Sequence, residues 1–350
     1  MSNGAHSRRG HWFGAAAVLA AGVVICAVIA PRAAAVGWLV GFAFWSQVSV
    51  GSLLLMMIHR LTGGRWGEAL WPVMEPMAAT IPLFLLLVIP LFIAIPALYP
   101  WFHPAGDIKP DVLTHYLNVP FFVVRSMIVL AVWGVLALLL PRLDGPRGQL
   151  VAALGLVFHC LVIGPIGVDW FLGVTPPFAS SSFGASVAVT QLIAALAFAL
   201  VVAPVREGDP ALADLGGLLL AFVLGITYID FMAVLVIWYG DVPATSRWFV
   251  ARMDASWRAL AWAAFALGCV VPILSLFLAR VRRGRGALRI VGASALIGLV
   301  CYDAYLVVPP FGTTALVPAA LSIIAIGLLL VALLRGQRRL ANTRRPAYGE

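Results

Sequence analysis

The sequence predicts an all-α polytopic membrane protein, on the basis of three observations. Apolar residues make up 63% of the 350 residues and charged residues only 11%, whereas a soluble globular protein is about half apolar and about a quarter charged. The apolar residues gather in runs of about 20, the length that crosses a bilayer as a helix. The charged residues lie mostly in short segments between these runs, which is the pattern of membrane topology signals.

Ten apolar runs are long enough to span the membrane. In chain order they are Trp12 to Ala30, Val36 to Ile58, Met77 to Leu98, Val119 to Leu140, Gln149 to Phe171, Gly184 to Ala203, Leu212 to Trp238, Trp257 to Ala279, Leu288 to Val307, and Thr314 to Leu334. The connections are too short for a soluble domain. We therefore expect one membrane domain over residues 12–334, a cytoplasmic tail of residues 1–11 and a basic cytoplasmic tail of residues 335–350.

The distribution of Lys and Arg predicts the orientation, because cytoplasmic connections carry an excess of these residues. With both termini cytoplasmic, 17 arginines lie on that face: Arg8, Arg9, Arg60, Arg65, Arg142, Arg147, Arg206, Arg280, Arg282, Arg283, Arg285, Arg289, Arg335, Arg338, Arg339, Arg344 and Arg345. The other face has 5 basic residues, which are Arg32, Lys109, Arg247, Arg252 and Arg258. The sequence therefore predicts a multi-pass protein of a bacterial cytoplasmic (inner) membrane.

The first apolar run also resembles a signal peptide, since Arg8 and Arg9 precede it and Ala33, Ala34 and Ala35 follow it. The run is longer than a usual signal core, so we expect it to be retained. The net charge of +9 does not predict nucleic-acid binding, because no basic patch lies outside the topology segments. The four cysteines stand singly inside apolar runs, which excludes zinc, disulfide and covalent haem motifs.

Five ionisable residues fall inside the expected spans. They are Arg125, His159, Asp169, Asp230 and Asp303. A charge in the bilayer costs about 2.5–3.5 kcal/mol even on lenient insertion scales, so such residues usually face the bundle interior and have a function. With a rise of about 1.5 Å per residue, Asp303 lies roughly 22 Å from the inner end of its span. The five residues form a ladder from the bilayer centre to the outer face.

Further polar residues accompany this ladder. Around the aspartates are Thr227, Tyr228, Tyr302 and Tyr305, which are their neighbours in the sequence. On the inner side, candidates for a proton entrance are His59, Glu68, Glu75 and Asp214. Between the two groups, the second span offers a helical stripe of hydroxyls at Ser46, Ser49 and Ser52.

The ladder indicates two half-pathways for protons, or an outer quinol pocket with a proton exit. A quinol loses two protons as its electrons leave, and a buried His or Asp suits that transfer. The structural alternative is a neutralised pair, Arg125 with Asp230 or with Asp303, and small-residue helix packing at the serines. Only His159 is deep enough for a haem ligand, and clustered cysteines for an iron–sulfur cluster are absent from the sequence. We expect no bound metal and no redox centre in this chain.

Several stretches resemble the second NrfD-like membrane subunit of bacterial alternative complex III, described as quinol:cytochrome c oxidoreductase quinone-binding subunit 2. The likeness covers most of the chain. It is carried by His59-Arg60-Leu61-Thr62-Gly63-Gly64-Arg65-Trp66-Gly67, Asp169-Trp170-Phe171, Ser181-Ser182-Phe183-Gly184, Asp214-Leu215-Gly216, Ile237-Trp238-Tyr239-Gly240-Asp241-Val242-Pro243, Val270-Val271-Pro272, and Tyr302-Asp303 with Tyr305 and Pro309. The first stretch and the Trp-Tyr stretch are the most specific.

The resemblance implies a ten-helix subunit in a respiratory complex. Its implied partners are a multihaem cytochrome c, an iron–sulfur protein, a sister NrfD-like subunit and an electron acceptor that can be a terminal oxidase. In such complexes the sister subunit is the better candidate for the quinol site, and this subunit is implicated in structure and proton conduction. The chain departs from the expected pattern near Gly217 and Met232-Ala233, where it lacks polar residues and places Asp230 close by.

Three functions therefore remain open. The first is a subunit of a quinol-oxidising complex that contributes a proton-conducting or quinone-binding site. The second is a purely structural anchor for redox subunits. The third is a secondary transporter, although the inverted repeats and broken midplane helices typical of transporters are not evident in the sequence.

Overall fold

The computed structural model describes residues 3–104, 108–176, 180–240 and 242–343, and every element assigned in these ranges is a helix. Nine helices of the described residues are long and apolar enough to cross a membrane. The all-α polytopic fold class is therefore confirmed. The first expected run lies in α1 (Asn3–Ile29), whose apolar described part, Ala17–Ile29, is shorter than a full span.

Each expected run lies over helical elements of the structure, and the third and eighth runs are interrupted. The long helices are α1, α2 (Pro31–Thr62), α3 (Arg65–Ala78), α8 (Val119–Leu139), α9 (Gly145–Trp170), α10 (Phe183–Val202), α11 (Ala211–Gly240), α13 (Ala255–Phe265), α16 (Arg285–Val307) and α17 (Leu316–Thr343). Short elements are α4 (Phe84–Leu87), α5 (Ile89–Ile93), α6 (Ile95–Leu98), α7 (Pro110–His115), α12 (Pro243–Val250), α14 (Val271–Phe277), α15 (Ala279–Arg283), and the turns η1 (Ile81–Leu83), η2 (Pro100–Phe102), η3 (Leu140–Arg142), η4 (Leu172–Val174), η5 (Ala266–Val270), η6 (Pro309–Phe311) and η7 (Thr313–Ala315).

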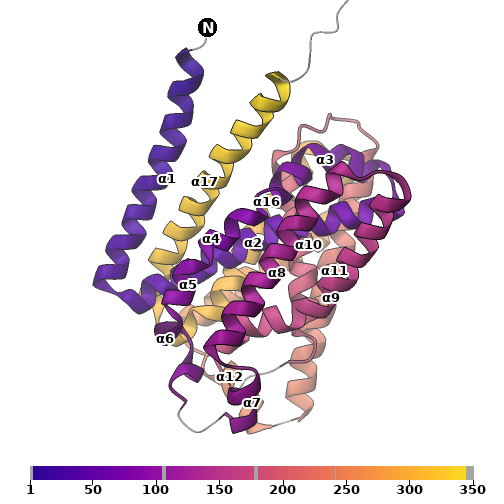
Figure 1. Cartoon of the computed structure of the whole chain (residues 1–350). Coiled ribbons are helices and arrows are strands. Elements are labelled where there is room, and N and C mark those ends of the chain that lie inside the picture. Colours follow the sequence, from indigo (N-terminus) through magenta and orange to yellow (C-terminus); the bar gives the residue numbers. More distant parts are fainter. Residues whose placement is uncertain (1–2, 105–107, 177–179, 241, 344–350) are drawn as a thin grey trace, which may run out of the picture.

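Helix α2 forms the centre of the bundle, and it packs against α17, α10, α3 and α9 (Figure 1). Small residues allow this packing, because a glycine lets two backbones approach closely. An added Cβ at Gly51 would lie 1.9 Å from the backbone oxygen of Gln191 on α10, and one at Gly37 would lie 2.5 Å from the backbone of α17. The glycines of α2 therefore set the distance between the central helices.

The third expected span differs from the structure at its start and in its interior. Its helix begins at Arg65 rather than at Met77, and after Ala78 it continues as η1, α4, α5 and α6. Proline lacks a backbone N–H and clashes with the preceding turn, so it interrupts a regular helix. Pro82, Pro90 and Pro96 each stand at the start of one of these short pieces. The regular span that the sequence predicted is therefore a chain of short helical turns.

The eighth expected span contains a wide turn. Helix α13 passes through the π-helical segment η5 (Ala266–Val270) before it continues as α14. The ring of Pro272 cannot join a regular α-helical ladder and would clash with the carbonyl four residues earlier. Single π turns accommodate such a residue, and they occur frequently at functional sites.

The connections gather at two opposite ends of the bundle. Figure 1 shows α3 and the N-terminus at one end and α6, α7 and α12 at the other. Ion pairs join the connections at the first end, Arg60 to Asp144 at 3.2 Å and Arg65 to Asp214 at 3.3 Å. We call this the basic end, and the end with α6, α7 and α12 the aromatic end. The connections between the long helices therefore lie at either the basic end or the aromatic end.

Candidate functional site

Arg125 and Asp169 form a buried ion pair between α8 and α9. The Nε and Nη2 atoms of Arg125 lie 2.5 and 2.7 Å from the two carboxylate oxygens. The structural alternative predicted from the sequence had paired Arg125 with Asp230 or with Asp303. That choice of partner was wrong. The sequence could not reveal which helices are neighbours, and α8 packs against α9.

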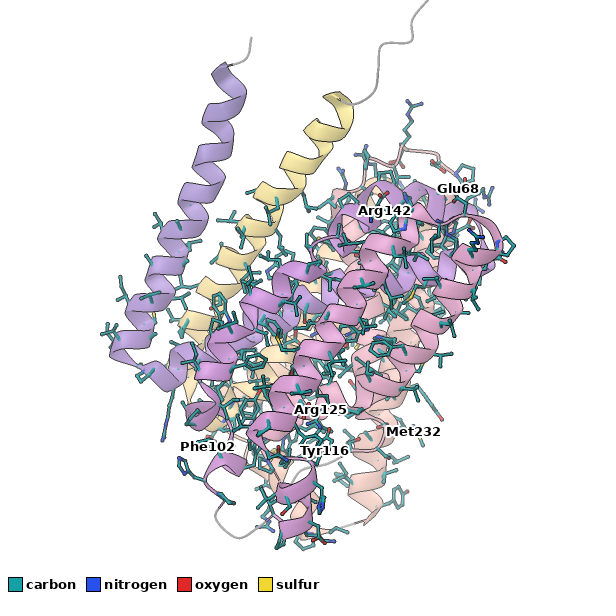
Figure 2. The ribbon with its side chains drawn as sticks, viewed as in Figure 1. Glu68, Phe102, Tyr116, Arg125, Arg142 and Met232 are labelled. Carbon is teal, nitrogen blue, oxygen red and sulfur yellow. The ribbon has the colours of Figure 1, made fainter. Side chains whose placement is uncertain are left out.

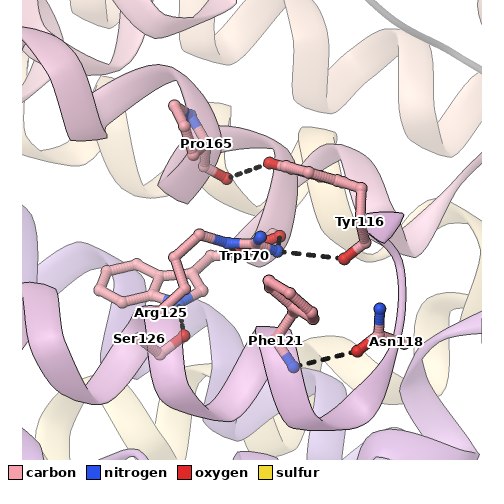
Figure 3. Close-up of polar contacts among 8 residues, drawn as sticks. Tyr116, Asn118, Phe121, Arg125, Ser126, Pro165 and Trp170 are labelled. Carbon is pink, nitrogen blue, oxygen red and sulfur yellow. Dashed lines mark hydrogen bonds and ion pairs between the residues drawn. The ribbon is translucent and has the colours of Figure 1, made fainter. Parts of the chain in front are cut away.

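Tyr116 packs against the guanidinium of this pair, as Figure 3 shows. The guanidinium lies 4.1 Å from the centre of its ring, and the Tyr116 hydroxyl donates to the Pro165 carbonyl at 3.2 Å. Burial, reinforced by the charge of Asp169 and opposed by Arg125, raises the pKa of Tyr116 to about 12, so the phenol stays a neutral donor. Trp170 also donates to Ser126 at 3.1 Å. These contacts tie α8 to α9, which is a structural role.

His159 and Trp133 form a second buried contact, with ring centres 5.5 Å apart. The His159 side chain is 3% exposed, and neither ring nitrogen has a hydrogen-bond partner among the described residues. The indole nitrogen of Trp133 is likewise without a partner there. The structure therefore does not connect His159 to the other members of the expected ladder.

Asp303 is held by Gln47, a residue that we did not single out from the sequence. The Nε2 atom of Gln47 lies 2.9 Å from each carboxylate oxygen, between α2 and α16. Asp303 is 1% exposed and forms no ion pair with a described residue. An amide in the middle of an apolar span was a signal for this contact, because a buried polar group needs a partner.

Asp230 lies at the edge of a cavity of about 560 Å³. The Ser186 hydroxyl on α10 donates to its carboxylate at 3.1 Å, and the Tyr302 side chain on α16 is a further hydrogen-bond partner. The other lining residues come from α10, α11, α13, η5 and α16 and are mainly apolar: Thr190, Ile193, Ile226, Thr227, Phe231, Val234, Ala261, Trp262, Ala264, Phe265, Gly268, Cys269, Gly298, Leu299 and Tyr305.

The cavity faces the apolar outer surface of the bundle. Phe231 on α11 is 60% exposed, and Trp262 on α13 is 68% exposed. Both line the cavity, so a lipid-soluble molecule can reach it sideways from the membrane. Tyr228, at 65% exposure, is not part of the lining. It points away from the group with which the sequence had placed it.

A smaller cavity of about 150 Å³ adjoins the first and shares Asp230, Tyr302 and Tyr305 with it. Three serines line it: Ser180, Ser182 and Ser186. The hydroxyls of Ser180 and Ser182 are 3.1 Å apart, and Ser186 reaches Asp230. A row of hydroxyls thus leads from Asp230 toward the aromatic end. In the sequence, only Ser182 of these three had stood out, as part of the stretch Ser181-Ser182-Phe183-Gly184.

The π segment η5 shapes the wall opposite Asp230. Gly268 and Cys269 of this segment line the larger cavity, and Gly298 on α16 faces Gly268. An added Cβ at Gly298 would lie 2.2 Å from the backbone nitrogen of Gly268. The wide turn and the glycine pair bring α16 against the helix formed by α13, η5 and α14, and they leave space beside Asp230. Neither feature has a pattern that we could recognise in the sequence.

Arg252 secures the aromatic end of the smaller cavity. Its guanidinium donates to the carbonyls of Trp248, Tyr305 and Leu306 at 2.9–3.3 Å and lies 3.6 Å from the centre of the Trp248 ring. Burial lowers the pKa of Arg252 to about 10, against the opposing effect of Tyr305, so the side chain remains a cation at neutral pH. It joins α12 to the end of α16 and fixes Tyr305 beside the cavity.

Of the four candidates for an inner proton entrance, Glu75, Asp214 and His59 have local contacts. Trp71 donates to Glu75 at 2.8 Å, Asp214 pairs with Arg65, and the His59 ring packs against Trp66.

The serine stripe of α2 is also divided among local contacts. Ser49 lies 2.9 Å from the Thr80 hydroxyl, whereas Ser46 and Ser52 donate to backbone carbonyls within α2. Hydrogen bonds among the described residues do not link these groups into a continuous path.

Comparison with protein-family models and with curated proteins gave no match to this chain. The geometry around Asp230 is therefore the basis for the functional conclusions.

Proposed function

We propose that the protein is a membrane subunit of a quinol-oxidising electron-transfer complex of the bacterial inner membrane, and that the Asp230 cavity binds the quinol head group. One observation supports this most strongly. An apolar cavity at the membrane-facing surface ends at a carboxyl group with two hydroxyl partners, Ser186 and Tyr302. A lipid-soluble ligand that releases protons suits this combination of walls and polar groups.

The reaction assigns a distinct task to Asp230. Oxidation of a quinol to a quinone breaks two O–H bonds and releases two protons and two electrons. The Asp230 carboxylate forms no ion pair with a described residue, so it is free to accept the two quinol protons one after the other as a general base, passing on the first before it takes the second. Tyr302 and Ser186 orient the carboxyl group. The electrons leave to redox centres on partner subunits, for which we propose an iron–sulfur protein and a multihaem cytochrome c.

The smaller cavity supplies a way out for the proton. Ser186 is hydrogen-bonded to Asp230, and Ser182 and Ser180 follow toward the aromatic end. Hydroxyl groups both donate and accept hydrogen bonds, so they can pass a proton along with intervening water. The proton is thereby released on the side opposite the basic end. By the predicted orientation, that side is the outer face of the membrane.

Kinetics of the intact complex test this proposal. Asp230→Asn removes the base but keeps its shape, and general-base groups contribute about 10²–10⁴-fold to rate. We expect quinol oxidation to fall at least about 100-fold, whereas Asp303→Asn, a buried acid outside the cavity, leaves the rate within a factor of a few. A wild-type rate in Asp230→Asn would exclude this role.

A purely structural anchor is the second candidate, and the outer half of α11 favours it. Val236, Trp238 and Tyr239 are 66%, 79% and 81% exposed, which leaves an apolar and aromatic surface at the end of a span. Such a surface can serve partner helices as well as lipid. Both candidate functions place the protein in a complex with redox subunits, so c-type haem and an iron–sulfur protein should co-purify with it in mild detergent. Purification of the protein alone would exclude both. Normal turnover in Asp230→Asn would leave the anchor.

A further inference from the structure

An arginine-rich segment joins α14 to α16 at the basic end of the bundle. Five arginines and no acid lie within residues 280–289: Arg280, Arg282, Arg283, Arg285 and Arg289. None of them takes part in the ion pairs found among the described residues. The acid in contact is Glu207, whose carboxylate accepts the backbone N–H of Arg285 at 3.1 Å. The segment therefore carries positive charge that described side chains do not neutralise.

A cavity of about 490 Å³ opens beside this segment. Its lining includes Arg280 and Arg283 of α15, Glu207 from the connection between α10 and α11, and the small residues Gly284 and Ala287. Arg280 and Arg283 stand three residues apart on a helical turn and so lie on the same face. Two guanidinium groups and one carboxylate give the lining a net charge of +1, which matches a group with a single negative charge.

Exposed apolar side chains flank the arginine-rich segment in the chain. Leu274 and Phe277 at the end of α14 are 65% and 61% exposed, Leu278 is 61% exposed, and Ile290 on α16 is 73% exposed. The chain therefore leads within a few residues from the charged lining to apolar side chains that need cover. Basic pockets of this kind at the ends of membrane helices bind anionic lipid head groups.

We propose that this cavity binds one anionic phospholipid. The phosphodiester lies between the guanidinium groups of Arg280 and Arg283, and the acyl chains cover Leu274, Phe277 and Ile290. A phosphate accepts hydrogen bonds from arginine in bidentate geometry. The proposal is independent of the quinol site, because it involves another end of the bundle and other residues.

Lipid titration of the delipidated complex in detergent tests the proposal. Binding of phosphatidylglycerol and of phosphatidylcholine with identical acyl chains is counted by native mass spectrometry. We expect wild type to prefer phosphatidylglycerol and Arg280→Gln/Arg283→Gln to bind it about 30-fold more weakly, since each basic side chain near an anionic lipid contributes about 1 kcal/mol. Phosphatidylcholine binding should not change.

A matched control removes two other charges from the same end. Arg142 and Arg147 are exposed there, and Arg142→Gln/Arg147→Gln should leave the preference for phosphatidylglycerol intact. An equal loss in the control, equal binding of both lipids by wild type, or displacement of the lipid by millimolar inorganic phosphate alone would overturn the proposal.

Discussion

The Arg125–Asp169 pair allows a quantitative prediction about stability. The Asp169 side chain is fully buried and that of Arg125 is 18% exposed, and two short contacts of 2.5 and 2.7 Å join them. Removing one partner of such a pair leaves a charge buried without compensation, which costs about 3–5 kcal/mol. Asp169→Leu should therefore lower the free energy of unfolding by about this amount.

A double-mutant cycle separates the pair from its surroundings. Arg125→Met alone leaves Asp169 without a cation and should cost a similar amount, whereas the Arg125→Met/Asp169→Leu double variant removes both charges. Apolar replacement of a complete buried pair is often neutral or stabilising. We therefore expect the double variant to be more stable than either single variant.

Unfolding of the purified protein in mixed micelles provides the measurement. The combined fluorescence of the 12 tryptophans follows unfolding, and they include Trp170, which donates to Ser126 in the same cluster (Figure 3). The free energies of unfolding of the wild type, the two single variants and the double variant should give a coupling energy of about 2 kcal/mol or more. A coupling energy near zero would refute the assignment of these two residues as partners.

Two further predictions concern packing and a buried polar group. Gly51→Ala should destabilise the protein by about 1–3 kcal/mol, because its Cβ would overlap the backbone oxygen of Gln191. Gly217→Ala has open space around the added Cβ and should not destabilise the protein. Thermal melting in detergent compares the two variants. His159→Phe should leave stability unchanged or raise it by about 1–3 kcal/mol, since both ring nitrogens lack described partners, and quinol oxidation should persist. A large loss of turnover in this variant would instead support a proton path through His159.

Much of the architecture could be predicted from the sequence, because apolar runs of bilayer length and the placement of arginines are local signals. The spans from Val119 to Val307 begin and end within a few residues of the helices in the structure, whereas α17 continues past the expected end at Leu334 to Thr343. The third span was less predictable, since Pro82 and Pro90 break a continuous apolar run into short helices. Helix breaking by proline depends on how neighbours satisfy the freed backbone groups.

The candidate site was only partly predictable, because pairing depends on which helices are neighbours. Intramembrane acids stood out from the sequence, but Asp169, Asp230 and Asp303 have three different surroundings: an arginine, a cavity and a glutamine. Figure 2 shows Arg125 and Tyr116 close together near the aromatic end, while Met232 lies on the separate α11. Sequence position alone could not separate Asp230 from the other two acids.

The most direct test of the quinol site is photolabelling of the intact complex. A photoreactive azidoquinone with an isoprenoid tail is bound in membranes, activated by light and located by peptide mass spectrometry. We predict labels on α11 at Phe231 or Val234 and on α13 at Trp262 or Phe265, all of which line the cavity, with competition by unlabelled quinol. Labelling confined to partner subunits or to other helices would contradict the proposal that the Asp230 cavity takes the quinol.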